Sequence, residues 1–79
     1  MPTAFVIINC ELGSEEEVLA ELRKMKNVNE AYAVYSIYDI VAKVESESLE
    51  KLKESIARNI RKLKHVRATL TMIVIEGGS

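Results

Sequence analysis

Several features are scarce in this chain of 79 residues, and each shortage excludes a class of protein. The single cysteine, Cys10, has no partner for an internal disulfide, so the fold does not depend on a disulfide framework. Eleven Lys and Arg against twelve Asp and Glu leave a net charge of −1, without the basic excess that binding to a phosphate backbone requires. No apolar run approaches the roughly 20 residues that span a bilayer. Direct nucleic-acid binding and membrane insertion are therefore disfavoured.

The common catalytic and metal-binding motifs are also missing. The sequence has no CxxC, no HExxH, no Gly-rich phosphate loop, and no cluster of His and carboxylates with metal-ligand spacing. The N-terminal MPTAFVII lacks the basic and apolar regions of a secretion signal. Glutamine is absent whereas Glu and Lys are abundant, a bias found in hyperthermophile proteins. We predict a cytoplasmic protein that is not an enzyme and uses no cofactor and no metal.

The composition is that of a globular protein, with 48% hydrophobic and 29% charged residues. A chain of this length forms one domain, and its core supplies only a few kcal/mol of net stability. Assembly with further copies would add to that stability. We predict one domain over residues 1–76 and a flexible tail over 77–79.

The first half of the chain has the pattern of a strand followed by a helix. Apolar residues occupy both the odd and the even positions of residues 3–11, which is typical of a strand covered on both faces. Ser14 and Glu17 then have the spacing of a capping box, and apolar residues follow at helical spacing until about Asn27.

The second half begins with a β-hairpin pattern and continues with a helix and a strand. Residues 31–44, AYAVYSIYDIVAKV, are two strand-like runs that meet at the bend 36–39. Ser48 is the expected N-cap of a second helix, with Ser46 an alternative start. The apolar stripe of that helix consists of Leu49, Leu52, Ile56, Ile60 and Leu63. Residues 66–75 alternate as a final strand.

The predicted order is therefore β-α-β-β-α-β, an α+β fold of the ferredoxin-like type. Right-handed crossovers place both helices on one face of a four-stranded antiparallel sheet. The other face is still apolar, because strand one presents there either Phe5 and Ile7 or Val6 and Ile8. Such a patch marks a protein interface, and we predict a two-fold dimer packed sheet to sheet.

Asp39 is the polar residue with two competing interpretations. An Asp beside a turn commonly bonds to local backbone. Alternatively, its carboxylate receives a small cation such as an amino-acid ammonium, with Tyr35 or Tyr38 as a wall. Thr69 and Thr71 share one face of the last strand, where β-propensity alone explains them, but their hydroxyls could also bind a ligand carboxylate.

Three further residues have simpler explanations. His65 lies where the second helix should end, and the helix dipole accounts for it without a catalytic role. Cys10 is expected to be a small buried hydrophobe. Asn9 either pairs with a neighbouring strand or marks a bulge.

Four stretches together resemble the ligand-binding domain of the Lrp/AsnC regulators, called the RAM domain. They are TAFVIINCELGSEEEVLAEL, AYAVYSIYDIVAKVE, SLEKLKESIARNIRKLKHV and RATLTMIVIE. The family typically has a Gly-x-x-Asp turn in the hairpin. Here the turn contains Asp39, and Ser36 stands in place of the glycine. The chain resembles a stand-alone domain of this type without the helix-turn-helix.

The resemblance implies a non-enzymatic module that binds an amino acid and modulates transcription. It implies sheet-to-sheet dimers that assemble into rings, often octamers, and co-assembly with full-length DNA-binding relatives. By the same resemblance, Ser36, Tyr38 and Asp39 are the ligand-binding candidates of the loop, and Thr69 and Thr71 are candidates from a neighbouring subunit. The alternatives are a structural oligomerisation domain without a ligand and an ACT-like regulatory domain of an amino-acid metabolic enzyme.

Overall fold

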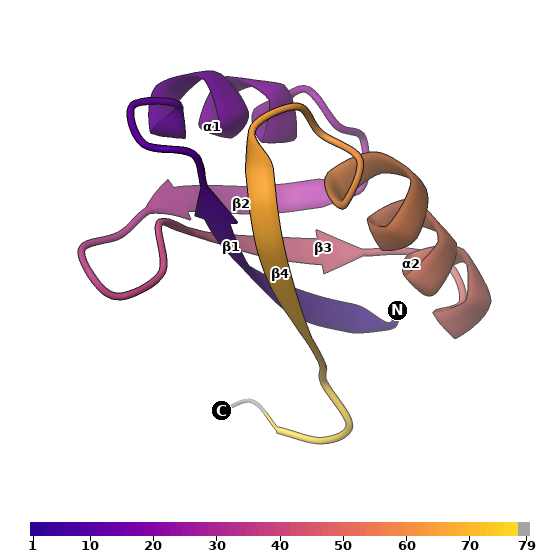
Figure 1. The fold of residues 1–79 in the computed structure, drawn as a ribbon. Helices are drawn as coiled ribbons and strands as arrows, with labels where there is room; N and C mark the ends of the chain where they lie inside the picture. The colour runs from indigo at the N-terminus through magenta and orange to yellow at the C-terminus, as the bar shows by residue number, and fades with distance from the viewer. Residues whose placement is uncertain (78–79) are drawn as a thin grey trace.

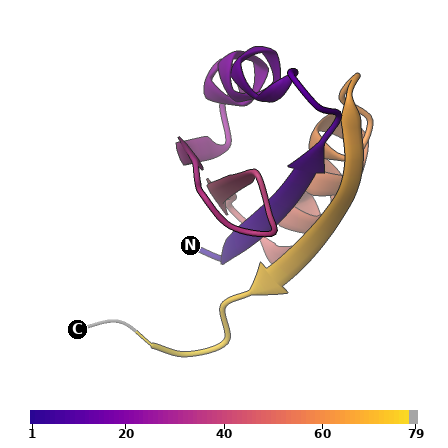
Figure 2. The same ribbon diagram turned by 60° about the vertical axis from the view of Figure 1, so that its left-hand side comes forward.

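The computed structural model describes residues 1–77 and confirms the predicted ferredoxin-like order. The elements are β1 (Thr3–Cys10), α1 (Glu15–Arg23), β2 (Val28–Ala33), β3 (Ile40–Glu45), α2 (Leu49–Ser55), the π-helical segment η1 (Ile56–Ile60) and β4 (Val66–Ile73). The strands form one antiparallel sheet of four in the order β2-β3-β1-β4. Both helices pack on one face of this sheet (Figure 1), and the rotated view shows the other face without a covering element (Figure 2).

The central strand β1 divides its side chains between the two faces. Ala4, Val6 and Ile8 are completely buried on the helix side. There they join the core residues of both helices, which are Val18, Leu22, Leu52, Ile56 and Ile60. Phe5 and Ile7 therefore lie on the open face, which selects the first of the two patches that the sequence allowed.

The start of α1 differs from the prediction. The helix begins directly after Ser14, but the Ser14 hydroxyl makes no capping bond. Instead it donates a hydrogen bond to the Glu11 carbonyl at 2.6 Å, so the capping box with Glu17 is wrong. The helix also ends at Arg23, one turn before Asn27, because the next amides bond to carbonyls only three residues back.

The second helix begins as predicted and then changes its pitch. The Ser48 side chain accepts a hydrogen bond from the Lys51 amide at 3.2 Å, which confirms Ser48 as the N-cap. After Ser55 the turn widens into η1, where the Arg61 amide donates to the Ile56 carbonyl at 3.0 Å. Leu49, the first position of the predicted stripe, is 44% exposed and does not belong to the core.

A β-bulge interrupts the pairing of β1 with β4, as one reading of Asn9 anticipated. Asn9 pairs with Ala68 whereas Cys10 pairs with Val66, so Arg67 is an extra residue on β4. The strand β4 ends at Ile73, two residues before the predicted end. Of the predicted tail 77–79, residues 78 and 79 lie outside the described residues. Within residues 1–77, neither helix has the length and apolarity to cross a bilayer.

His65 has a different role from the one predicted. Its backbone adopts a positive φ of 74°, and its carbonyl accepts a hydrogen bond from the Glu11 amide at 2.8 Å. Its ring nitrogens lie 2.6 Å from a Glu11 oxygen and 3.0 Å from a Glu17 oxygen. His65 thus ties the loop before β4 to the loop after β1, so the dipole of the second helix is not its main partner.

Ile8 tests the importance of the buried face of β1. Because Ile8 is completely buried, Ile8→Ala should lower the free energy of unfolding by about 2–5 kcal/mol, measured by urea denaturation. Leu12→Ala is the control, since Leu12 is 99% exposed and should change stability by at most about 0.5 kcal/mol. Equal effects of the two substitutions would contradict the assignment of the core.

Cys10 gives a test of burial that depends on pH. Burial raises the pKa of its thiol from 9.0 to about 11, and the nearby Asp39 carboxylate adds to the shift. A raised pKa means that the folded state favours the neutral thiol. The stability that this preference contributes is therefore complete below pH 9 and is lost between pH 9 and 11. The stability of the wild type relative to Cys10→Ala should therefore fall by about 2 kcal/mol between pH 8 and pH 10.5. A constant difference would contradict this environment.

Candidate ligand-binding site

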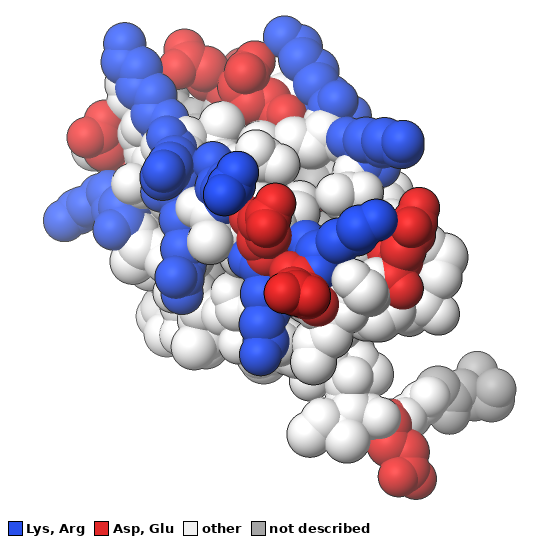
Figure 3. Space-filling view, turned by 90° about the vertical axis from the view of Figure 1, so that its right-hand side faces the viewer, with Lys and Arg blue, Asp and Glu red and all other residues white. Residues whose placement is uncertain are grey.

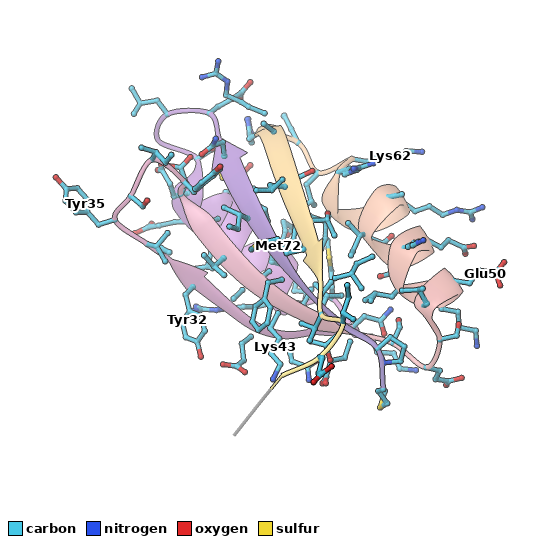
Figure 4. The ribbon with its side chains drawn as sticks, turned by 90° about the horizontal axis from the view of Figure 1, so that it is seen from below. Tyr32, Tyr35, Lys43, Glu50, Lys62 and Met72 are labelled. Carbon is cyan, nitrogen blue, oxygen red and sulfur yellow. The ribbon has the colours of Figure 1, made fainter. Side chains whose placement is uncertain are left out.

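The loop that joins β2 to β3 is longer and more open than the predicted four-residue bend. It spans residues 34–39, and it closes where the Val34 amide donates to the Asp39 carbonyl at 2.9 Å. Ser36 and Ile37 are exposed, Tyr38 is half-buried, and Tyr35 is fully exposed. Tyr35 projects from the loop away from the sheet (Figure 4), so it forms no wall beside Asp39 within one protomer.

Asp39 has a structural role, but its carboxylate bonds to the backbone of β1 and not to the local backbone of the turn. Its Oδ2 accepts a hydrogen bond from the Cys10 amide at 2.7 Å, and its own amide donates to the Ile8 carbonyl at 3.0 Å. The carboxylate thereby fastens the loop to the end of β1 beside the bulge. Its Oδ1 has no hydrogen-bond partner among the described residues, so it can still receive a cationic group.

Asp39 also lines a cavity of about 440 Å³, with Asn9, Cys10, Ile37, Arg67 and Ala68 as the other lining residues. This loop cavity contains one carboxylate and one guanidinium. A free amino acid carries one ammonium and one carboxylate, so the charges of the cavity are complementary to it. Arg67 reaches this place because it is the extra residue of the bulge.

Thr69 and Thr71 lie elsewhere in the protomer. They pair with Ile8 and Val6 of β1, so their side chains face the helix layer. Thr71 lines a second cavity of about 340 Å³ between the second helix and β4, which we call the helix–strand cavity. The structure therefore brings neither threonine into the loop cavity of the same protomer.

Sequence reasoning missed three basic residues of these cavities. They are Arg67 in the loop cavity and Lys53 and Arg61 in the helix–strand cavity. Lys53 and Arg61 belong to a helix whose basic residues are interleaved with acidic ones, a pattern typical of a solvated face. Figure 3 shows that face with both kinds of side chain. No periodicity could reveal Arg67, because a bulge shifts the alternation of a strand.

Comparisons with known proteins agree with the fold and with the kind of domain. A family model described as the Lrp/AsnC ligand binding domain matches residues 3–77. The structure of FFRP-DM1 is similar, with a TM-score of 0.91 and 43% identity over 95% of this chain and 100% of that chain. The structure of AsnC from E. coli has a TM-score of 0.88 and 26% identity over 96% of this chain and 52% of that one.

Two curated relatives are transcriptional regulators of Pyrococcus furiosus. The HTH-type transcriptional regulator FL11 of Pyrococcus furiosus is 30% identical over 73 residues, which cover 92% of this chain and 48% of the relative. The chain thus spans about half the length of the curated relatives it matches, at 49% and 48% of them. The match over residues 3–77 and the shared fold show that this chain belongs to the Lrp/AsnC ligand-binding domain family.

Proposed function

We propose that this chain is an amino-acid-binding and oligomerisation module that modulates transcription, by assembling with itself or with full-length Lrp/AsnC regulators. The observation that carries the proposal is the match of residues 3–77 to a ligand-binding domain whose relatives are named transcriptional regulators. Such a module works in the cytoplasm and contains no catalytic group, and the full-length regulators that it joins would contact DNA.

The open face of the sheet supports oligomerisation. Apolar side chains of all four strands meet there in register, and they are Phe5, Ile7, Tyr32, Val41, Leu70 and Met72. Leu70 and Met72 are 48% and 45% exposed although they occupy the strand interior. Met72 (Figure 4) lies on the edge strand β4, opposite Phe5 of β1. A second copy that packs against the face would remove this area from water, and a two-fold axis makes the patch complementary to itself.

The loop cavity supports amino-acid binding. In the proposed complex, Asp39 Oδ1 accepts a hydrogen bond from the ligand ammonium, and Ser36 and Tyr38 of the same loop approach the ligand as subunits assemble. Thr69 and Thr71 would come from a neighbouring subunit, because the protomer holds them away from the loop. The dimers would then assemble into a ring with ligands at the junctions.

A structural oligomerisation domain without a ligand is the second candidate. The hydrogen bond from the Cys10 amide already gives Asp39 a purely structural use. Ser36 in place of the glycine that the family typically has in this turn also favours this candidate.

Asp39→Asn separates the two candidates. The amide oxygen of Asn can still accept the bond from the Cys10 amide, whereas the charge that attracts an ammonium is gone. Titration calorimetry with the standard amino acids should show a ligand for the wild type and binding at least about 10-fold weaker for the variant, with assembly unchanged. Tyr35→Ala is the control because its side chain lines neither cavity. Binding by no amino acid to the assembled wild type, or equal binding by wild type and Asp39→Asn, would favour the structural candidate.

Met72→Glu tests the dimer. In a two-fold interface each substitution appears twice, so two carboxylates would be buried without partners and the dimer should weaken by at least about 100-fold. Native mass spectrometry at micromolar concentration measures the outcome. Leu12→Glu places the same charge on an exposed loop away from the sheet and should leave assembly intact. A wild type that is monomeric under these conditions would disprove the sheet-to-sheet dimer.

A further inference from the structure

The proposed function uses only Thr71 of the helix–strand cavity, but the cavity as a whole has three properties of a binding site. Its wall consists of Lys53, Ile56, Ala57, Arg61, Thr71 and Ile73, and its volume is about 340 Å³. This volume lies in the range of small-molecule sites, roughly 300–1,000 Å³. The lining combines apolar side chains with two cations and one hydroxyl, and it includes no carboxylate.

The first property is an unsatisfied hydroxyl. Thr71 Oγ1 is buried and has no hydrogen-bond partner among the described residues. Buried polar groups in native proteins almost always have a partner, and each exception requires an explanation. Thr71 is a lining residue of the cavity, although its hydroxyl oxygen is not accessible from it. Rotation of the side chain about χ1 would turn the hydroxyl into the cavity, where a bound molecule could supply the missing hydrogen bond.

The second property is unpaired positive charge. Neither Lys53 nor Arg61 forms an ion pair within residues 1–77. Lys51 on the same helix shows the contrast, because it pairs with Glu47 at 3.2 Å. Two cations at one cavity whose lining contains no carboxylate attract an anionic group.

The third property is the π-helical segment η1, which forms one wall. Segments of this kind are rare and frequently occur at functional sites. The wide turn closes with the bond from the Arg61 amide to the Ile56 carbonyl, and both residues line the cavity. The small side chain of Ala57 lies between them and leaves space at the wall.

We propose that the helix–strand cavity binds the carboxylate of a small aliphatic acid. Lys53 and Arg61 provide the positive charge, the Thr71 hydroxyl donates a hydrogen bond to the carboxylate, and the aliphatic chain packs on Ile56, Ala57 and Ile73. Where the ligand is an amino acid, which rests on the proposed function, this cavity selects one with an acidic side chain.

Titration calorimetry on the full chain tests the proposal with L-glutamate, glutarate and L-glutamine. Glutarate carries the same carboxylate on a similar chain without the ammonium, and glutamine replaces the side-chain carboxylate by a neutral amide. Glutamate and glutarate should bind at least about 10-fold more tightly than glutamine, because only they bring a charge to the two cations. Lys53→Gln and Arg61→Gln should each weaken both ligands by about 10-fold. Lys51→Gln is the matched control, since Lys51 lies on the same helix outside the cavity, and it should bind like the wild type.

Thr71→Val adds a readout that does not depend on a ligand. Valine has the shape of threonine without the hydroxyl, so the substitution removes an unsatisfied buried group. The ligand-free variant should unfold at a higher temperature than the wild type and should bind glutarate several-fold more weakly. A lower unfolding temperature together with unchanged binding would show that the hydroxyl has no role toward a ligand.

The outcomes separate this proposal from the proposed function. If another amino acid binds in an Asp39-dependent way while glutamate and glutarate do not bind, the cavity proposal fails and amino-acid sensing stands. If glutarate binds through Lys53 and Arg61 while no amino acid depends on Asp39, the cavity proposal holds and the sensor fails. Binding of glutarate that is unchanged in Lys53→Gln and Arg61→Gln overturns the cavity proposal. Both proposals are overturned if neither glutarate nor any standard amino acid binds.

Discussion

The burial of β1 is the constraint on which the rest of the structure depends. β1 is hydrogen-bonded to β3 along one edge and to β4 along the other. The strand therefore cannot shift without breaking its backbone pairs on both sides. Its even-numbered side chains form the floor of the core, and its odd-numbered side chains Phe5 and Ile7 lie on the open face. The chain supplies a cover for only one of these faces. A domain of this size has little net stability of its own. A second copy that buries the uncovered apolar area would therefore stabilise the fold as well as form the interface.

Asp39 connects this strand to the loop that is proposed to bind a ligand. Its bond to the Cys10 amide needs only an acceptor oxygen, and a neutral side chain could provide one. The negative charge is therefore not required by the structural role, although it raises the pKa of the Cys10 thiol beside it. A charge that exceeds the structural need is consistent with a second use, and the guanidinium of Arg67 in the same cavity is the complement that a zwitterion requires.

The sequence predicts those features that depend on local periodicity or on the alternation of a buried strand. The strand β1 follows from its run of apolar residues, and the N-cap of α2 follows from a serine placed before an apolar stripe. Which parity of β1 faces the helices did not follow from the sequence, because both parities are apolar. Features that depend on competition between partners were missed. The Ser14 hydroxyl had two acceptable positions, and it bonds to the Glu11 carbonyl instead of capping α1. The site is less predictable still, since the helix–strand cavity depends on the wide turn of η1, and Arg67 depends on a bulge.

The positions of the two cavities limit how a ligand could use both. Figure 1 shows the loop between β2 and β3 on the opposite side of the protomer from α2. The loop cavity lies beside this loop, and the helix–strand cavity lies beside α2. One small amino acid therefore cannot contact Asp39 and Thr71 of the same chain. A ligand held by both would have to lie where the loop of one protomer meets the cavity of another. That contact differs from the contact between open faces, and two different contacts per protomer generate assemblies larger than a dimer. By linkage, such a ligand would stabilise the larger assembly by as much as the assembly strengthens ligand binding. In the proposed module, sensing and assembly are therefore one equilibrium.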